Sequence, residues 1–152
     1  MTKQPTVLVT GGAGYVGSHV CKALHRAGVT PVTLDNLSTG HQQAVKWGPL
    51  EVGDVRDGDF VTEVMIRHKA TAVLHFAALS LVGESAGKPY EYYANNVNGV
   101  LSLVGAMRRC NPHPLERLIH HSHRVVAQQG FPACLTCSTA DPAGRPTRAT
   151  TS

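Results

Sequence analysis

The feature that most constrains this chain is a glycine-rich stretch near its start, residues 10–19, with the sequence Thr-Gly-Gly-Ala-Gly-Tyr-Val-Gly-Ser-His. An apolar run of strand type, Thr6–Thr10, precedes it, and a segment with helical spacing of apolar residues follows it. Glycines here let the backbone turn tightly and approach a pyrophosphate closely. The N–H groups that begin the helix then face the anion, with the positive end of the helix dipole behind them.

An acidic residue favours a dinucleotide site over an ordinary glycine-rich turn. Asp35 ends a second strand-like run, about 20 residues beyond the loop, where such sites place the carboxylate that binds a ribose. The alternative for Asp35 is a helix cap or a turn former. The spacing of the glycines leaves two patterns open, Gly11-Gly14-Gly17 and Gly12-Gly14-Gly17.

Strand-like and helix-like segments alternate along the chain. Strands are predicted at Thr6–Thr10, Val32–Leu34, Leu50–Gly53, Ala72–Phe76 and from Glu116–Ile119 onward. Helices are predicted at 15–27, 58–68 and 90–109, with a polar loop at 37–41 and another through Gly83 and Lys88-Pro89. The alternation predicts an α/β fold, an incomplete Rossmann-like, doubly wound parallel sheet of about four to five strands. Ligands of such sheets bind at the carboxyl ends of the strands.

Apolar periodicity predicts which side chains are buried. The stripe expected on the long helix is Val97, Val100, Leu101, Val104 and Met107, and that on the first helix is Val16, Val20, Ala23, Leu24 and Ala27. Tyr92 and Tyr93 are expected to be packing residues. His75 is interpreted as a buried histidine with its hydrogen bonds satisfied rather than a catalytic one.

Composition excludes several classes of function. The net charge of +4 is scattered and few aromatic residues accompany it, so no nucleic-acid partner is expected. No apolar run reaches the ~18 residues of a membrane span, and the chain enters its first strand with no signal peptide. Four cysteines in 152 residues do not make a disulfide framework, which indicates a reducing cytoplasm.

The character of the sequence changes after Ile119. Residues 120–124, His-His-Ser-His-Arg, stand where an apolar strand should continue. Beyond them no helix of ten residues with an apolar stripe can be drawn, apart from a weak candidate around residues 125–129. We therefore predict a truncated nucleotide-binding domain at 1–119 and an unstructured, unrelated tail at 120–152. Cys134 and Cys137 form a C-x-x-C, but a zinc site needs four converging ligands, so no metal is predicted.

Several segments together resemble one family of enzymes. They are the glycine-rich stretch, residues 35–40, His75–Ala78, Val82–Ser85, Lys88-Pro89 and Tyr92–Gly99. In these segments the chain resembles the UDP-glucose 4-epimerases, of the NAD-dependent epimerase/dehydratase family in the extended short-chain dehydrogenase/reductase superfamily. The resemblance covers about residues 6–119 and none of the tail.

The resemblance implies a tightly held NAD. The glycine loop would hold the pyrophosphate, Asp35 the adenosine ribose, residues 54–55 the adenine and residues 76–79 the nicotinamide-side ribose. The residues implied to contact NAD are Gly11, Gly14, Tyr15, Val16, Gly17, Asp35, Asn36, Ser38, Thr39, Gly40, Asp54, Val55, Phe76, Ala77, Ala78, Leu79 and Asn95. Asn95 has an alternative role, tying its helix to a neighbouring loop. Many relatives carry Lys where this chain has Ser80.

The family interconverts UDP-glucose and UDP-galactose through a 4-keto intermediate, and it needs a Tyr-x-x-x-Lys pair and a strand hydroxyl. No tyrosine here has lysine four places on, and no tyrosine follows Tyr93. No catalytic residue is therefore assigned, and the chain as written is expected to be inactive. A reading frame that shifts near Ile119 would account for the abrupt change of composition.

Three alternatives to an epimerase remain open at this point. The chain could derive from another sugar-nucleotide enzyme, such as a dehydratase or decarboxylase, whose glycine loop is similar. It could be a non-catalytic NAD-binding or subunit-interaction module, because the corresponding long helix joins a homodimer interface in the family. It could also be a product that never folds stably.

Overall fold

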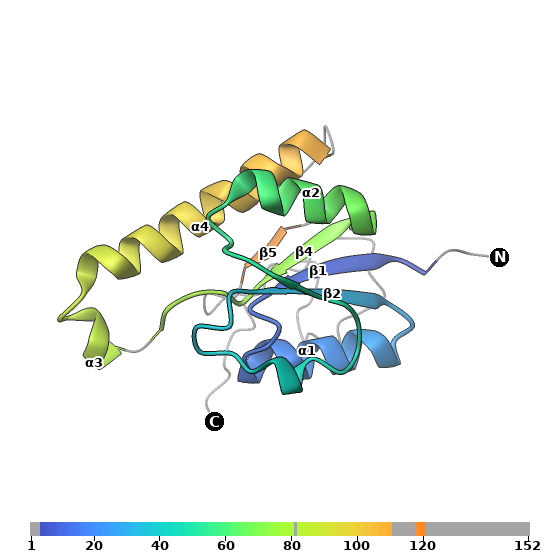
Figure 1. Cartoon of the computed structure of the whole chain (residues 1–152), viewed down its shortest axis with the longest axis horizontal. Coiled ribbons are helices and arrows are strands. Elements are labelled where there is room, and N and C mark those ends of the chain that lie inside the picture. The colour runs from blue at the N-terminus through green and yellow to red at the C-terminus, as the bar shows by residue number, and fades with distance from the viewer. Residues whose placement is uncertain (1–3, 81, 111–117, 121–152) are drawn as a thin grey trace, which may run out of the picture.

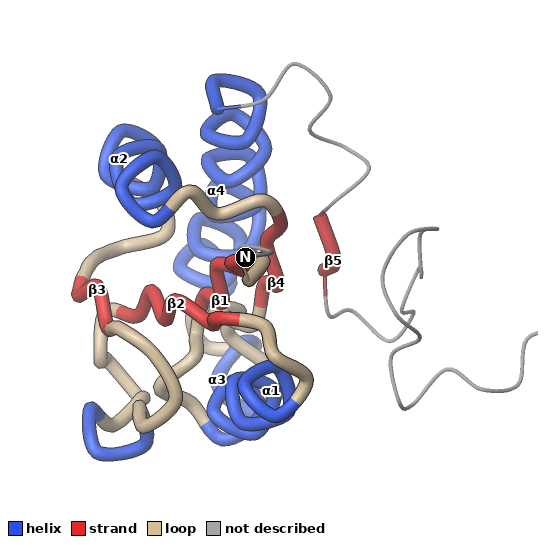
Figure 2. The backbone as a smooth tube through the Cα atoms, turned by 90° about the vertical axis from the view of Figure 1, so that its right-hand side faces the viewer, coloured by secondary structure: helices blue, strands red, loops and turns tan. Residues whose placement is uncertain are grey.

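The computed structural model describes residues 4–80, 82–110 and 118–120. Five strands form one sheet: β1 (Thr6–Thr10), β2 (Thr30–Asp35), β3 (Leu50–Val52), β4 (Ala72–His75) and β5 (Leu118–His120). All the pairings are parallel, and the strand order is β3-β2-β1-β4-β5. Figure 1 shows β2, β1, β4 and β5 side by side, and Figure 2 shows all five strands. The order reverses between β1 and β4, as in a Rossmann-like fold, so the predicted fold class is confirmed.

Helices cover both faces of the sheet. Helix α1 (Tyr15–Arg26) lies on one face, and α2 (Gly58–His68) and α4 (Pro89–Cys110) lie on the other (Figure 2). Two short elements complete the described chain, the 3₁₀ turn η1 (Gln42–Ala44) and α3 (Val82–Ser85). Among the described residues, no helix is both long and apolar enough to cross a membrane.

Alternating side chains of the strands build two cores. Leu8, Val32, Leu34 and Val73 pack with residues of α2 and α4. Val7, Val9 and Ala72 pack with Cys21 of α1 on the opposite face. Three successive β1 residues are therefore fully buried, which explains why this strand is a continuous apolar run rather than an alternating one.

Residues at the helix ends determine where the helices begin and stop. Helix α1 stops before Gly28, which has a positive φ of 76°. Asp57 caps α2 by accepting a hydrogen bond from Phe60 N, and Asp59 lies in the first turn of this helix. Lys69 ends α2 in the left-handed conformation, with φ 53°.

The predicted burial of α4 is partly wrong. Its buried residues are Tyr92, Gly99, Leu103, Ala106 and Met107, whereas Tyr93, Val97 and Leu101 are exposed. The buried face packs against α2 and the sheet and includes two small residues that let the backbone approach closely. A β-carbon at Gly99 would lie only 3.1 Å from Val55 Cγ1. Apolar residues lie on two faces of α4, and periodicity does not say which of them is covered.

Three smaller predictions also need correction. Residues 82–85 form α3, where a loop was expected. In α1 the covered side is at Gly17 and Cys21, while Val16 and Ala23 are exposed. Strand β2 runs from Thr30 to Asp35 and is longer than predicted, because it pairs along its length with β1. His120, the first residue of the predicted unstructured tail, ends β5 instead, and the other predictions for the tail lie outside the described residues.

Candidate functional site

A pocket opens at the carboxyl edge of the sheet, where β1, β2, β3 and β4 end. The loops that follow these strands form its walls, and α4 contributes one side chain. Its lining residues are Gly11, Gly14, Leu34, Asp35, Asn36, Ser38, Thr39, Gly53, Val55, Phe76, Ala77, Ala78, Leu79 and Asn95. The glycine loop and residues 35–36, 55 and 76–78, which follow four different strands, are thus brought together at this edge.

Some expected residues do not line this pocket. Three of them, Tyr15, Val16 and Gly17, belong to the first turns of α1. Gly40 is packed against Asp35. The side chain of Asp54 is hydrogen-bonded to Arg56. Two lining residues were missed, Leu34 and Gly53. Each immediately precedes an acidic residue at the end of a strand. Their position at the strand ends could therefore have predicted that they line the pocket.

The glycine loop is shaped by positions that exclude a side chain. Gly11 has φ 71°, and a β-carbon there would lie 2.6 Å from the carbonyl carbon of Phe76. A β-carbon at Gly17 would overlap the carbonyl oxygen of Gly11. Gly12 instead faces the side chain of Thr33, away from the pocket. Gly11 and Gly14 line the pocket and Gly12 does not, so of the two open patterns Gly11-Gly14-Gly17 is the one whose first two glycines face the pocket.

The beginning of α1 leaves room for an anion. Gly14 is its N-cap, no side chain accepts a hydrogen bond there, and the first turn has no acidic residue. Helix α2 differs on both counts, because Asp57 caps it and Asp59 follows. The N–H groups of the first turn of a helix have no partner within that helix. At α1 these groups and the helix dipole favour a phosphate.

Asp35 links the glycine loop to the loop after β2. Its side chain is buried, with Oδ2 accepting from Ala13 N at 3.0 Å and Oδ1 accepting from Leu37 N at 2.8 Å. The second bond makes Asp35 a turn former, as the alternative interpretation expected. The residue also lines the pocket, so the two roles coexist. A β-carbon at Gly40 would lie 3.1 Å from Asp35 Oδ1, which leaves no space for a larger residue.

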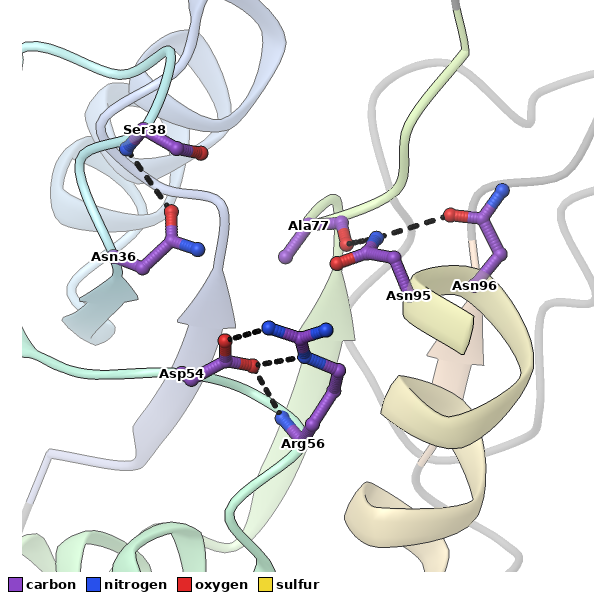
Figure 3. A network of polar contacts seen from close by, with 7 residues as sticks. All are labelled: Asn36, Ser38, Asp54, Arg56, Ala77, Asn95 and Asn96. Atoms are coloured by element: carbon purple, nitrogen blue, oxygen red, sulfur yellow. Dashed lines mark hydrogen bonds and ion pairs between the residues drawn. The ribbon is translucent and has the colours of Figure 1, made fainter. Parts of the chain in front are cut away.

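Two asparagines of α4 fix the loop after β4 (Figure 3). Asn95 Nδ2 donates to the carbonyl of Ala77 at 3.2 Å and to Asn96 Oδ1 at 3.1 Å. Asn96 holds Leu79 from both sides, accepting from its N–H and donating to its carbonyl, each at 2.9 Å. Asn95 therefore ties its helix to the loop and lines the pocket as well. Asn96 was missed because nothing in the sequence distinguishes it from its neighbour.

An ion pair stands at the end of β3. The Arg56 guanidinium donates to both carboxylate oxygens of Asp54, at 2.9 and 2.5 Å, and Arg56 N donates to Oδ1 at 2.8 Å (Figure 3). The hydrogen bonds from the Arg56 side chain hold the pKa of the Asp54 carboxyl below its usual value. Asp54 is thus a fixed anion between two pocket-lining residues, Gly53 and Val55.

His75 of β4 has a structural partner. It is buried, and its Nδ1 lies 2.6 Å from Thr10 Oγ1 across the β1–β4 pair. This hydrogen bond through Nδ1 supports a structural role for the buried His75. In the described part of the chain, no group of three or more His, Cys, Asp or Glu side chains is placed to hold a metal ion.

Known proteins that are similar to this chain include UDP-glucose 4-epimerases. A UDP-glucose 4-epimerase of Rhizobium leguminosarum bv. trifolii is 54% identical over 101 residues, which are 66% of this chain and 31% of that protein. The crystal structure of UDP-glucose 4-epimerase from Brucella ovis in complex with NAD superimposes with a TM-score of 0.72 and 46% identity, covering 76% of this chain and 35% of that one.

A third relative is more distant but has the same fold. The UDP-glucose 4-epimerase from Bifidobacterium longum, in complex with NAD⁺ and UDP, has a TM-score of 0.67 and 35% identity over 76% of this chain and 36% of its own. The present chain thus spans about a third of the length of each of these three proteins. The predicted resemblance is confirmed for the part of the chain that they cover.

A family model decides the classification. The model of the NAD dependent epimerase/dehydratase family matches residues 7–146. Its match runs past residue 119, so the predicted domain boundary at that residue stays a prediction. The chain belongs to the NAD dependent epimerase/dehydratase family.

Proposed function

We propose that this chain binds NAD at the carboxyl edge of its sheet, as the cofactor-binding part of a UDP-glucose 4-epimerase. The observation that carries the proposal is the pocket itself, which gathers the glycine loop, Asp35 and Asn95 at one place. The residues fit the cofactor, because β-carbons at Gly11 and Gly17 would clash with backbone atoms and so prevent the tight glycine loop from forming, and a buried carboxylate lies where a ribose is expected.

Each part of the pocket has a proposed task. Backbone N–H groups of Tyr15 and Val16 bind the pyrophosphate at the start of α1, and Asp35 accepts hydrogen bonds from the adenosine ribose. A carboxylate there repels a 2′-phosphate, which favours NAD over NADP. Residues 36–40 lie on the same side, residues 54–55 flank the adenine, and residues 76–79 with Asn95 lie along the nicotinamide-side ribose.

NAD, when bound, would supply an acceptor for the hydride that leaves carbon 4 of the sugar as the 4-hydroxyl is oxidised to a ketone. The proton of that hydroxyl must go to a base, and the family's base is the tyrosine of a Tyr-x-x-x-Lys pair, which this sequence lacks. We therefore propose that the 152 residues hold the cofactor and do not interconvert UDP-glucose and UDP-galactose on their own. Another nucleotide sugar as the substrate of the whole enzyme would leave the cofactor proposal unchanged.

Thermal unfolding with and without NAD tests the cofactor proposal. A ligand that binds only the folded state at 100 times its Kd adds about 2.7 kcal/mol of stability. We expect the melting temperature of the 152-residue chain to rise with NAD and to rise less with NADP. An unchanged melting temperature at millimolar NAD would contradict the proposal, and turnover of UDP-galactose by the purified chain would contradict its inactivity.

We also propose that the chain pairs with a second copy through α4. Four large apolar side chains lie exposed along this helix at spacings of three and four residues: Tyr90 (83%), Tyr93 (72%), Val97 (47%) and Leu101 (64%). A contiguous apolar stripe on a helix supports association through that face. Light scattering should give the mass of a dimer, and Val97→Asp with Leu101→Asp should give a monomer that still binds NAD. A wild-type chain that stays monomeric at high concentration would contradict this.

We propose that the protein is cytoplasmic, because its described cysteines are free thiols. In the described part of the chain, Cys21 and Cys110 are free. Burial raises the pKa of the Cys21 thiol, which keeps it protonated and unreactive. Free thiols support a reducing compartment.

A further inference from the structure

We propose that Gly99 of α4 is a positioning residue for the adenosine half of the cofactor, because its lack of a side chain lets Val55 stand back from the pocket. The inference rests on the proposed NAD site and deepens it, since it names the residue that sets the width of the pocket at one wall. Gly99 is buried and does not itself line the pocket, so it acts through Val55.

Val55 stands at the adenosine end of the pocket. It follows β3, which is the neighbour of β2 on the side away from β1. Asp35 ends β2 and is proposed to bind the adenosine ribose. Gly53 N donates to the carbonyl of Asp35 at 3.1 Å, which fixes the start of the loop after β3 beside that residue. The residues proposed for the nicotinamide side follow β4 instead, on the other side of β1.

Val55 is held between the pocket and the helix behind it. It is 5% exposed, lines the pocket, and belongs to the core that α2 and α4 form with the sheet. A β-carbon at Gly99 would lie 3.1 Å from Val55 Cγ1 and 4.0 Å from His75 Cε1. The distance to His75 is an ordinary van der Waals contact, whereas the distance to Val55 requires one of the two residues to move by a few tenths of an ångström.

The direction of this movement follows from what surrounds Val55. Its neighbours in the core are closely packed and leave no room for a displaced methyl group, whereas the pocket is open space. A residue larger than glycine at position 99 would therefore push the Val55 side chain into the space proposed for the nucleotide. The nucleotide-free chain loses little by this movement, so the effect falls on binding rather than on folding.

The same helix offers a matched control in Gly105. A β-carbon there would meet Arg109 Nη1 at 3.8 Å, an ordinary contact with the end of a flexible side chain. Both glycines lie inside α4, and alanine is a better helix former than glycine. Gly99→Ala and Gly105→Ala thus bring the same gain in helix propensity, but only the first narrows the pocket.

The experiment titrates the full 152-residue chain and its variants with NAD and with ADP, and it measures their melting temperatures without nucleotide. We expect Gly99→Ala to weaken binding of both nucleotides about fivefold or more, because the displaced wall belongs to the adenosine half that they share. Its melting temperature should be no lower than that of the wild type. Gly105→Ala should bind both nucleotides within about twofold of the wild type.

A double variant shows whether the effect passes through Val55. Val55→Ala removes Cγ1, the atom that a β-carbon at Gly99 would crowd. In a chain that already carries Val55→Ala, adding Gly99→Ala should therefore change the NAD affinity less than about twofold. An undiminished loss in that background would show that Gly99 does not act through Val55.

The other outcomes that contradict the inference are distinct. A clearly lower melting temperature of Gly99→Ala would show that the core, and not the pocket, takes up the crowding. Unchanged affinity for both nucleotides would show that Gly99 has no role in binding, and weaker binding of NAD alone would show that Val55 is not at the adenosine half. All of these leave the proposed cofactor site intact, whereas a wild type that binds neither nucleotide contradicts that site as well.

Discussion

At the scale of single residues, the tightest point of the glycine loop is Gly17. A β-carbon there would overlap the carbonyl oxygen of Gly11 and lie 2.8 Å from Gly12 Cα. These are backbone atoms and cannot rotate away. We expect Gly17→Ala to lower the free energy of unfolding by about 2 kcal/mol and to abolish NAD binding, as the loop moves. Chemical denaturation and NAD titration measure the two effects.

Gly14→Ala is the control for this change. Its β-carbon would lie 3.3 Å from the same oxygen of Gly11, a contact that a small shift relieves. The stability of this variant should fall clearly less than that of Gly17→Ala. Equal stabilities of the two variants would show that the crowding at Gly17 is not what shapes the loop.

Lys69 carries a conformational cost that glycine would remove. It ends α2 with φ 53°, and its side chain is exposed. A left-handed backbone costs a residue with a β-carbon about 1 kcal/mol relative to glycine. Lys69→Gly should therefore raise the free energy of unfolding by about 0.5–1 kcal/mol in urea denaturation. Lys69→Ala keeps the β-carbon and should bring no gain, so a gain in both variants would point to the charge instead.

Most residues that line the pocket could be predicted, because glycines and an acidic residue at strand ends carry a strong local signal. Asp35 and Asn36 were found in this way and line the pocket, whereas Asn95, which lies within α4, was named only from the family resemblance. The supporting residues could not be predicted. Arg56 and Asn96 act through hydrogen bonds to Asp54 and Leu79, and those bonds depend on where the backbone places them.

At the scale of elements, the carboxylate of Glu51 links β3 to the last turn of α2 through hydrogen bonds. Glu51 lies 2.6 Å from His68 Nε2 and accepts two hydrogen bonds from Arg67 Nη1, at 3.1 and 3.0 Å. The hydrogen bond with His68 contributes most to lowering the pKa of Glu51 below 4.5. A depressed carboxyl pKa means that the ionised form stabilises the fold. This contribution is fully present above the unfolded pKa and is lost as the pH falls through the folded pKa.

Glu51→Gln should therefore reduce the acid sensitivity of folding. Between about pH 6 and pH 3, the wild type should lose more stability than this variant, as urea denaturation at each pH would show. Glu63→Gln is the control, because Glu63 is 64% exposed and pairs with the same Arg67. It should follow the wild type. If all three proteins lose equal stability on acidification, the link between β3 and α2 is not responsible.

The order of the elements could be predicted, and the packing of α4 could not. Strand runs and helix caps such as Asp57 are local, so the sequence contains them. The exposed stripe with Val97 and Leu101 is as apolar as the buried face with Leu103 and Met107. Only the positions of α2 and the sheet decide which face is covered. α3 was missed because four residues are too few for a helical period.

At the scale of the whole molecule, the boundary predicted after residue 119 can be tested by limited proteolysis. Trypsin sites lie on both sides of it, at Arg124 and Arg148 beyond the boundary and at Arg56 and Arg67 within the folded sheet domain. We expect early cleavage beyond residue 119 and a persistent product that NAD protects further. Mass spectrometry identifies the product. Early cleavage at Arg67 would contradict the predicted division.

The strand order has a consequence for how the protein is made. The described residues that line the pocket all lie between Gly11 and Asn95, and β5 at the sheet edge contributes none of them. Domains form from the N-terminal side as the chain leaves the ribosome. A nascent chain can thus assemble the strands that carry the proposed NAD site, with β1 at the centre and β2 and β4 beside it, before the residues after α4 are translated. The proposed NAD site would then be complete, and able to bind NAD, before translation of the chain ends.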